Sequence, residues 1–277
     1  MEKLISILAI SALILVSVIG IKSAEPNSEM FGQKSSEFYN QIRNHEAVTI
    51  ELDRSGHCTG VVVSKDEIIT AAHCVQVIVK QYGTQVSDWQ MVASHMHAVF
   101  QDGTRLDAVD IVGLGYPATQ DDWAILKFDE KEMSEAKARP ALCSQTYIDN
   151  PPVVGKKIFH VGSPGEARLA MTFGYVSSYN TDGPQYGVWH GVVDGDIHGA
   201  PGSSGGPLFD LSGNLVGLVI AGGPSGLTSY IPMSSFTKEC NGRYGVFYRT
   251  AKHMHSLNHF MKDMGFKEKQ PNPGMTP

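Results

Sequence analysis

A serine bracketed by glycines is the residue whose surroundings are best suited to chemistry. Residues 199–208 read GAPGSSGGPL and lead into an apolar run. Glycines allow backbone conformations closed to other residues and let another chain approach closely. The amides of Gly202 and Ser204 can therefore converge on one point, where two N–H groups would stabilise an oxyanion formed by attack on a carbonyl. Ser204 is a candidate nucleophile, although this segment alone also fits a plain surface turn.

A serine hydroxyl needs a base that takes its proton during attack. His73 is the only one of the 11 histidines that directly follows an apolar β-like run, and the alanines before it allow close packing. The imidazole in turn needs a fixed carboxylate that holds its tautomer. Asp122 meets this need because it immediately precedes the alternating run 123–128, and Asp121 is the competing choice.

The three motifs TAAHC, DWAIL and GSSGGPL, in this order, resemble the histidine, aspartate and serine motifs of the trypsin/chymotrypsin superfamily. The resemblance covers about residues 47–264. It implies an all-β fold of two six-stranded antiparallel barrels with a C-terminal helix and the site in the cleft between the barrels. It also implies that Ser204 is the nucleophile, His73 the general base and Asp122 the carboxylate that orients it.

Two further features indicate a branch of this superfamily. Ser203 stands where zymogen-activated members carry an aspartate that pairs with a new N-terminus, so we expect no activation by that route. Residues 162–165 (GSPG) and 228–232 (TSYIP) resemble stretches of the HtrA and glutamyl-endopeptidase branches. We expect a minimal member of this group, because the residues after the catalytic domain are too few for a PDZ module.

The four cysteines are Cys58, Cys74, Cys143 and Cys240, and they agree with an oxidising destination. No CxxC spacing occurs, which excludes a zinc site built from two such pairs. The resemblance implies a disulfide between Cys58 and Cys74, equivalent to the histidine-loop bridge of the family. For Cys143 and Cys240, a second bridge and free thiols both remain open.

The resemblance also implies which residues contact the substrate side chain before the scissile bond, the P1 side chain. The run 215–221 and Gly222 would edge its pocket, and Ala221 and Gly222 are small enough to leave it open. His198 falls where the family often places the residue at the pocket floor. A histidine there would favour an acidic P1 residue, as in glutamyl endopeptidases, although those enzymes place their histidine on a different strand. The alternative is that His198 is an ordinary loop residue.

Two other groups of histidines have spacings that resemble part of a metal site. His95 and His97 would share one face of a strand, and the sequence offers no third ligand beside them. His253, His255 and His259 fall on the expected C-terminal helix, the last two one turn apart. We interpret both groups as structural or solvated, and we expect no metal and no cofactor.

The elements that must position these residues are mostly strands. From residue 47 onward, short apolar or alternating runs are separated by Gly, Pro, Asn and Asp, which is typical of all-β proteins. Asp102-Gly103 indicates a hairpin, residues 250–264 an amphipathic helix, and the charged segment 130–150 a crossover between subdomains. The candidate strands are residues 47–52, 60–63, 67–70, 90–100, 106–113, 123–128, 157–161, 171–178, 187–193, 207–210, 215–221 and 228–232.

The N-terminal segment has the character of a targeting signal. Residues 4–21 form an apolar run behind Lys3, which indicates export, but the run is also just long enough for an uncleaved transmembrane anchor of roughly 17–25 residues. We expect a signal peptide or anchor at 1–24, a pro-segment or stalk at 25–46, a protease domain at 47–267 and a flexible tail at 268–277. The protein would then be secreted, extracytoplasmic or membrane-anchored.

Composition and charge narrow the function. The net charge of −6 provides no field for binding a polyanion, so we expect polypeptide substrates and no nucleic acid. An esterase nucleophile elbow would lead from GxSxG into a helix, whereas SSGGPLF leads into a strand. The sequence therefore predicts a serine endopeptidase. The alternative is a catalytically silent homologue that binds a peptide or a protein partner.

Overall fold

The computed structural model describes residues 28–266, apart from 55, 84, 118–120, 151, 167, 179–191, 196–199, 223–227, 243 and 248–255. The chain divides into two units, residues 1–39 and 40–277. The first contributes most of α2 (Ser28–Gln41), on which the rings of Phe38 and Tyr39 meet edge to face. No helix in the described part of the chain is both long and apolar enough to cross a bilayer. The expected signal or anchor and the expected C-terminal tail lie outside the described residues.

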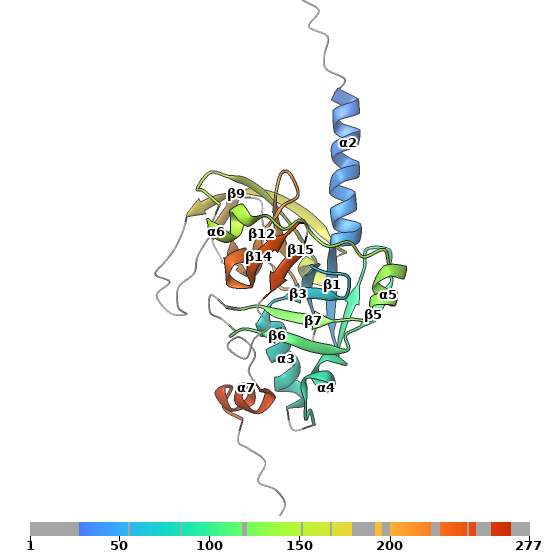
Figure 1. Ribbon diagram of the computed structural model, residues 1–277, viewed down its shortest axis with the longest axis vertical. Helices are drawn as coiled ribbons and strands as arrows, with labels where there is room; N and C mark the ends of the chain where they lie inside the picture. The colour runs from blue at the N-terminus through green and yellow to red at the C-terminus, as the bar shows by residue number, and fades with distance from the viewer. Residues whose placement is uncertain are drawn as a thin grey trace, which may run out of the picture. The chain divides into compact units, whose positions relative to one another are not determined.

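The second unit begins with a seven-stranded antiparallel sheet in the order β5-β4-β1-β2-β3-β7-β6 (Figure 1). Its buried side chains are mainly aliphatic, with Ile50, Ile68 and Ile125 fully enclosed. The short helix η1 (Ile42–Glu46) leads into this sheet. The strands are β1 (Ala47–Leu52), β2 (Gly56–Val62), β3 (Glu67–Thr70), β4 (Met96–Val99), β5 (Arg105–Asp107), β6 (Asp110–Leu114) and β7 (Ala124–Lys127).

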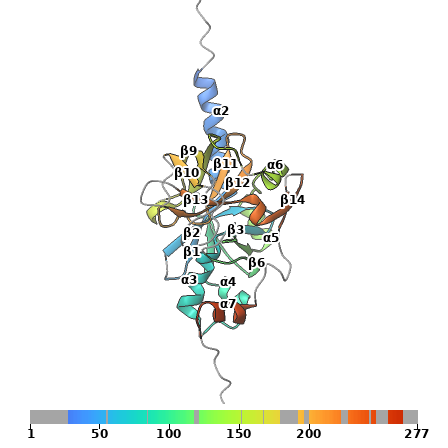
Figure 2. The same ribbon diagram turned by 90° about the vertical axis from the view of Figure 1, so that its left-hand side faces the viewer.

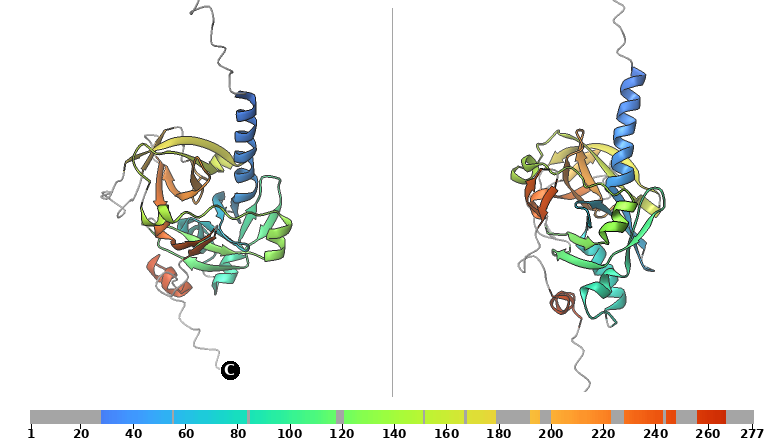
Figure 3. Two further views of the ribbon diagram at one scale, coloured as in Figure 1. Left: turned by 45° about the horizontal axis from the view of Figure 1, so that its top comes forward. Right: turned by 45° about the vertical axis from the view of Figure 1, so that its right-hand side comes forward.

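The other strands form a closed antiparallel barrel in the order β10-β13-β12-β11-β8-β9. Strand β10 pairs with both β9 and β13 and so closes the barrel, whose core includes the stacked rings of Phe159 and Phe209. Figure 3 shows this barrel in yellow and orange beside the first sheet in blue and green. Its strands are β8 (Lys157–Gly162), β9 (Ala170–Ser178), β10 (Val192–Gly195), β11 (Pro207–Asp210), β12 (Leu215–Gly222) and β13 (Thr228–Pro232), followed by a separate hairpin of β14 (Thr237–Asn241) and β15 (Tyr244–Phe247).

The predicted all-β class is confirmed: two curled antiparallel sheets carry the second unit and helices are few. The first sheet has seven strands rather than six, because the segment expected as one strand at 106–113 breaks into β5 and β6. At the break the chain changes partners. The Ala108 amide donates to the Met96 carbonyl, and the next amide, of Val109, donates to the Lys127 carbonyl on the other side.

The strand predicted at 90–100 is wrong in its first half, which forms helix α4 (Trp89–Ala93). Asp88 caps this helix by accepting a hydrogen bond from the Met91 amide at 2.8 Å, and N-caps of this kind set helix starts. The hairpin predicted at Asp102-Gly103 is confirmed by the antiparallel pairing of β4 with β5. Gly103 adopts a φ of 93°, a conformation that glycine allows.

Helix α3 (Ala72–Tyr82) was not predicted, because its first residues were interpreted only as the turn after a strand. Its buried residues Val75, Ile78 and Val79 nevertheless have helical spacing. Helices α5 (Glu130–Glu135) and α6 (Gln145–Asp149) lie in the connection between the two sheets. The remaining short helices are η2 (Pro164–Glu166) and η3 (Met233–Ser235).

The C-terminal helix α7 (Leu257–Asp263) is found within the range expected for it, and residues 248–255 lie outside the described part. It packs beside α4, where the rings of Trp89 and Phe260 meet edge to face at 5.6 Å between centroids (Figure 2). The Tyr116 hydroxyl also donates to Asp263 at 2.8 Å. These contacts attach the end of the domain to the first sheet.

A disulfide joins Cys143, in the connection between the sheets, to Cys240 on β14, 97 residues later. The sequence left this pair open because no family pattern specified it. In the chain-entropy view, closing a loop of this order stabilises the fold by about 4.7 kcal/mol. The bridge therefore fastens the β14–β15 hairpin to the connection between the sheets.

His160 on β8 is a buried histidine directly beneath the glycine-rich loop. Its Nδ1 lies 3.1 Å from the Pro207 carbonyl, and its Nε2 has no hydrogen-bond partner among the described residues. A Cβ added to Gly206 would lie 2.3 Å from the ring. Burial lowers the pKa of His160 from 6.5 to about 4, against a smaller opposing effect of the hydrogen bond to Pro207. The ring is therefore neutral in the folded protein at neutral pH.

We predict that His160 makes the protein less stable as the pH falls from about 6.5 to about 4. In this window the unfolded chain binds a proton at His160 that the folded chain does not, so stability rises with pH. By linkage the loss at pH 4.5 is about 2 to 3 kcal/mol relative to pH 7. Urea unfolding of wild type and His160→Gln at both pH values measures it. An equal loss in both proteins would contradict the prediction.

Candidate active site

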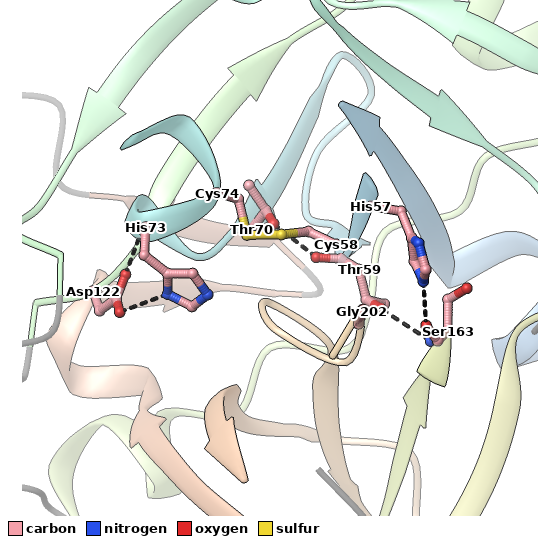
Figure 4. The surroundings of a disulfide bond; sticks show 9 residues. All are labelled: His57, Cys58, Thr59, Thr70, His73, Cys74, Asp122, Ser163 and Gly202. Carbon is pink, nitrogen blue, oxygen red and sulfur yellow. Dashed lines mark hydrogen bonds and ion pairs between the residues drawn. A yellow bond between two sulfur atoms is a disulfide. The ribbon is translucent and has the colours of Figure 1, made fainter. Parts of the chain in front are cut away.

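His73 and Asp122 are brought together by the pairing of β3 with β7, in which Thr70 lies opposite Ala124. His73 is in the first turn of α3, three residues beyond the end of β3, and Asp122 lies just before β7. The Asp122 Oδ2 atom is 2.8 Å from His73 Nδ1, and Oδ1 accepts the His73 backbone amide at 2.9 Å (Figure 4). Asp122 therefore fixes both the ring and the backbone of His73.

This geometry determines which ring nitrogen is available. With Nδ1–H donating to the buried Asp122 carboxylate, the neutral ring keeps Nε2 as a proton acceptor. The His73 side chain is 28% exposed, so the ring is only partly enclosed by the protein. The carbonyl of Asp121, the competing residue, instead accepts the Trp123 amide.

The loop that carries Ser204 is a tight, glycine-dependent turn. Gly202 and Gly205 adopt φ values of 99° and 79°, and a Cβ on Gly202 would come within 2.2 Å of the Ser163 carbonyl oxygen. The Gly205 amide donates to the Val219 carbonyl on β12 at 2.6 Å. Among the described residues, the amides of Gly202 and Ser204 have no acceptor. Two N–H donors in this loop are therefore available to a ligand.

Thr59 on β2 holds this loop against the first sheet. Its amide donates to the Ser204 carbonyl at 2.8 Å, and its hydroxyl donates to the Gly202 carbonyl at 2.7 Å. The same hydroxyl oxygen accepts the Ser163 amide at 3.0 Å, and its carbonyl accepts the Thr70 hydroxyl at 2.7 Å. Thr59 is fully buried, so every one of its polar groups is used inside the protein.

The disulfide between Cys58 and Cys74 links the loop to His73. Cys58 precedes Thr59, which bonds to Ser204, and Cys74 follows His73; the two Cα atoms are 6.4 Å apart. Within the described part of the chain, no hydrogen bond joins the Ser204 hydroxyl to the His73 ring. Catalytic hydrogen bonds of this type are often long without substrate and shorten when it binds.

The residues predicted for P1 specificity are only partly described. His198 lies outside the described residues. Ala221 and Gly222 end β12, two and three residues beyond Val219, whose carbonyl holds the Ser204 loop. A preference for an acidic P1 side chain therefore stays a prediction.

The structure gives His95 and His97 carboxylate partners that the sequence did not show. His95 Nδ1 lies 3.1 Å from one oxygen of Asp53, and His97 Nε2 lies 3.0 Å from the other. His97 Nδ1 also lies 2.7 Å from Asp107. Both oxygens of Asp53 and one oxygen of Asp107 thus each lie within hydrogen-bonding distance of a ring nitrogen. This is a structural ion cluster rather than an open ligand set.

Of the remaining candidates for metal binding, only His259 lies in the described part of the chain. His259 pairs with Asp263 at 3.3 Å on α7, whereas His253 and His255 lie outside the described residues. Among the residues that the structure describes, the only group with metal-binding proximity contains His73 and two cysteines. The sulfurs of these cysteines, Cys58 and Cys74, form the disulfide and so are not thiolate ligands.

Thr59, His57 and Ser163 were not identified from the sequence. His57 Nε2 lies 2.7 Å from the Ser163 carbonyl oxygen, which itself borders Gly202. Thr59 and Gly202 are separated by 143 residues, so no local pattern could have revealed their contact. The only signal was the position of Thr59 beside Cys58.

Comparison with known proteins places this chain in a family. Residues 58–218, more than half of the chain, match the trypsin-like peptidase domain. A probable periplasmic serine endoprotease of the DegP-like type from Halomonas elongata is 26% identical over 240 residues, covering 79% of this chain and 44% of that protein. Its counterpart from Brucella suis is 34% identical over 142 residues, covering 50% and 26%. The chain spans less than half the length of these relatives.

Solved structures agree on the fold. The serine endoprotease from Yersinia pestis aligns with a TM-score of 0.50 and 22% identity over 71% of this chain and 62% of that one. The HtrA-type protease AlgW aligns with a TM-score of 0.50 and 22% identity over 70% of this chain and 59% of that one. At this identity the likeness supports the fold alone. With the family match, it follows that the chain belongs to the trypsin-like peptidase family and is related to the HtrA-type serine proteases.

Proposed function

We propose that the protein is a serine endopeptidase in which Ser204 is the nucleophile, His73 the general base and Asp122 its orienting carboxylate. The observation that carries the proposal is the double contact of Asp122 with the His73 ring and backbone. This contact leaves Nε2 of His73 as the proton acceptor. The Cys58–Cys74 disulfide connects the segment that carries His73 to the strand that holds the Ser204 loop. The amides of Gly202 and Ser204 would form the oxyanion hole.

In the first half of the reaction, the Ser204 Oγ atom attacks the scissile carbonyl carbon while His73 Nε2 takes the hydroxyl proton. The negative charge moves to the carbonyl oxygen, where the two amides donate to it. Asp122 stabilises the imidazolium through Nδ1–H. The C–N bond then breaks, the proton on His73 passes to the leaving amine, and an acyl ester remains on Ser204.

In the second half, water replaces the amine. His73 takes a proton from the water as its oxygen attacks the ester carbon, and the same amides stabilise the second oxyanion. Collapse breaks the bond to Ser204 Oγ, which regains its proton from His73. The products are a carboxylic acid and an amine, and no external cofactor is required by these steps.

A catalytically silent homologue that binds peptide in the same cleft is the alternative. Loss of activity usually accompanies loss of a catalytic residue, and this chain keeps a histidine, aspartate and serine together with the glycine loop. We therefore favour the active enzyme acting on polypeptide substrates. The relatives named as periplasmic support an extracytoplasmic location, with residues 1–24 as the export segment and 47–267 as the protease domain.

We predict that Ser204→Ala abolishes labelling of the purified protein by a fluorophosphonate probe and lowers kcat on a casein-type substrate by about 10⁶-fold. The reason is that only the nucleophilic oxygen forms the covalent bond with the probe. Gel fluorescence of the probe measures this directly. Labelling that persists in Ser204→Ala, or a wild type that is never labelled, would contradict the assignment.

The neighbouring serine supplies a matched control. Ser203 lies in the same loop, but it is buried, with 1% of its surface exposed, whereas Ser204 is partly exposed. Ser203→Ala should therefore keep the labelling that Ser204→Ala loses. The opposite pattern would transfer the role of nucleophile to Ser203.

We predict that Thr59→Val lowers kcat by about 10- to 100-fold with a much smaller change in KM. Valine keeps the shape of threonine but leaves the Gly202 carbonyl and the Ser163 amide without their buried partner, a loss of about 1–3 kcal/mol for each group. The loop would then hold its amides less well for the oxyanion. Steady-state kinetics and the rate of fluorophosphonate labelling measure the effect.

The conservative variant distinguishes positioning from general stability. Thr59→Ser keeps the hydroxyl and should restore most of kcat, even though the lost methyl group lowers the melting temperature. If Thr59→Ser and Thr59→Val were equally impaired, or if kcat followed the melting temperature alone, the positioning role would be refuted.

A further inference from the structure

A cavity of about 500 Å³ opens beside the candidate active site, on the side of Gly202 away from His73. Its walls include His57 and Ser163, and a Cβ on Gly202 would lie 2.2 Å from both the His57 Nε2 atom and the Ser163 carbonyl oxygen. Figure 4 shows His73 and Asp122 on one side of Gly202, and His57 and Ser163 on the other. A peptide with its scissile carbonyl at Gly202 can therefore extend a neighbouring side chain into this cavity.

The charges that line the cavity are three arginines and two carboxylates: Arg54, Arg105, Arg168, Glu51 and Asp53. Glu51 on β1 forms an ion pair with Arg105 on β5, which lies beyond the intervening strand β4. These two opposite charges satisfy each other. The charge of the cavity therefore depends on Asp53, Arg54 and Arg168.

Both carboxylate oxygens of Asp53 are already bound by histidines. His95 and His97 contact its two oxygens at 3.1 and 3.0 Å, and the Asp53 amide donates to the His95 carbonyl at 3.1 Å. The hydrogen bond from His95 lowers the pKa of the Asp53 carboxyl, which is therefore ionised at neutral pH and held by the imidazoles. Its function in this wall is to anchor the turn that follows β1.

Arg54 and Arg168 have no carboxylate partner within the described part of the chain, and both are exposed. Arg54 follows the anchored Asp53 and has a φ of 57°, a left-handed conformation uncommon outside glycine. Arg168 comes from the loop between β8 and β9, on the second barrel. Each barrel thus contributes to the same cavity one guanidinium that pairs with no carboxylate among the described residues.

The cavity also has apolar surface. Leu52, Phe100 and Leu169 line it together with these arginines. Such a combination suits a side chain that has methylene groups and ends in a carboxylate, because a guanidinium offers a planar pair of donors to both carboxylate oxygens. A large cavity with a few polar groups is the usual form of a specific subsite.

We propose that this cavity is a second substrate subsite, which binds the carboxylate of an acidic peptide residue close to, but not at, the P1 position through Arg54 and Arg168. The proposal rests on the proposed endopeptidase function. It adds a preference for acidic substrates that is separate from any P1 preference at His198. It also gives a role to two guanidiniums, one from each barrel, that pair with no carboxylate in the described part of the chain.

The test uses quenched fluorescent peptides that carry Glu or the isosteric Gln at one position at a time, from four residues before to four residues after the cleaved bond. At one position other than P1, wild type should cleave the Glu peptide with a kcat/KM about 3- to 10-fold higher than the Gln peptide. The ratio should fall towards 1 in the double variant Arg54→Asn/Arg168→Gln. Asparagine is chosen at 54 because it tolerates the left-handed backbone.

Lys80→Gln is the control for charge, because it removes an exposed cation on α3 that does not line the cavity. It should keep the full Glu/Gln ratio. Amidated and free peptide C-termini distinguish a side-chain carboxylate from the terminal one, and only the former is expected to matter. A ratio near 1 in wild type at every position, or one unchanged in the double variant, would overturn the proposal. So would a preference that follows the terminal carboxylate or is equally lost in Lys80→Gln.

Failure of the subsite and failure of the endopeptidase proposal are distinguishable. A wild type that reacts with the fluorophosphonate but shows no Glu/Gln difference is an active enzyme without this subsite. If wild type neither reacts nor cleaves, the endopeptidase proposal is wrong, and fluorescence polarisation then decides the subsite. In that case, the subsite is supported if wild type binds a labelled Glu peptide about 3- to 10-fold more tightly than the Gln peptide and the double variant does not. Equal binding of the two peptides by wild type refutes it.

Discussion

The geometry of the candidate site depends on the buried hydrogen bonds of Thr59. This one residue of the first sheet binds the carbonyls of Gly202 and Ser204 and the amide of Ser163, all from the second barrel. A buried polar group without a hydrogen-bond partner costs free energy, so the arrangement of the barrels that keeps all these hydrogen bonds is favoured. The carbonyls of the loop are engaged by Thr59, and the amides of Gly202 and Ser204 have no acceptor among the described residues.

Gly202 lies between the two functional regions. On one side are His73 and its carboxylate, and on the other are His57 and Ser163 at the edge of the charged cavity (Figure 4). The space around Gly202 is so limited that any side chain would collide with the His57 ring and the Ser163 carbonyl oxygen. The absence of a side chain at this position therefore allows the barrels to approach and joins the cavity to the proposed catalytic cleft.

Covalent and ionic links hold the surrounding segments at fixed positions. The Cys58–Cys74 disulfide joins the strand that carries Thr59 to the first turn of α3, which contains His73, and the second disulfide anchors the β14–β15 hairpin. Asp53, which is bound by His95 and His97, anchors the turn that contains Arg54. Beneath the loop, the neutral ring of His160 fills the space below Gly206 without introducing a charge.

The sequence by itself determined the all-β class, most strand positions and the residues proposed for chemistry, because period-two patterns and short motifs are local properties of the chain. It misjudged residues 90–93, which form a helix capped by Asp88, and residues 106–113, where the strand changes partners at Ala108. Tertiary structure alone decided the role of Thr59, the partners of His95 and His97, and the cavity with Arg54 and Arg168. These depend on contacts between segments far apart in the chain, and their formation is set by packing of the two barrels rather than by any neighbouring residue.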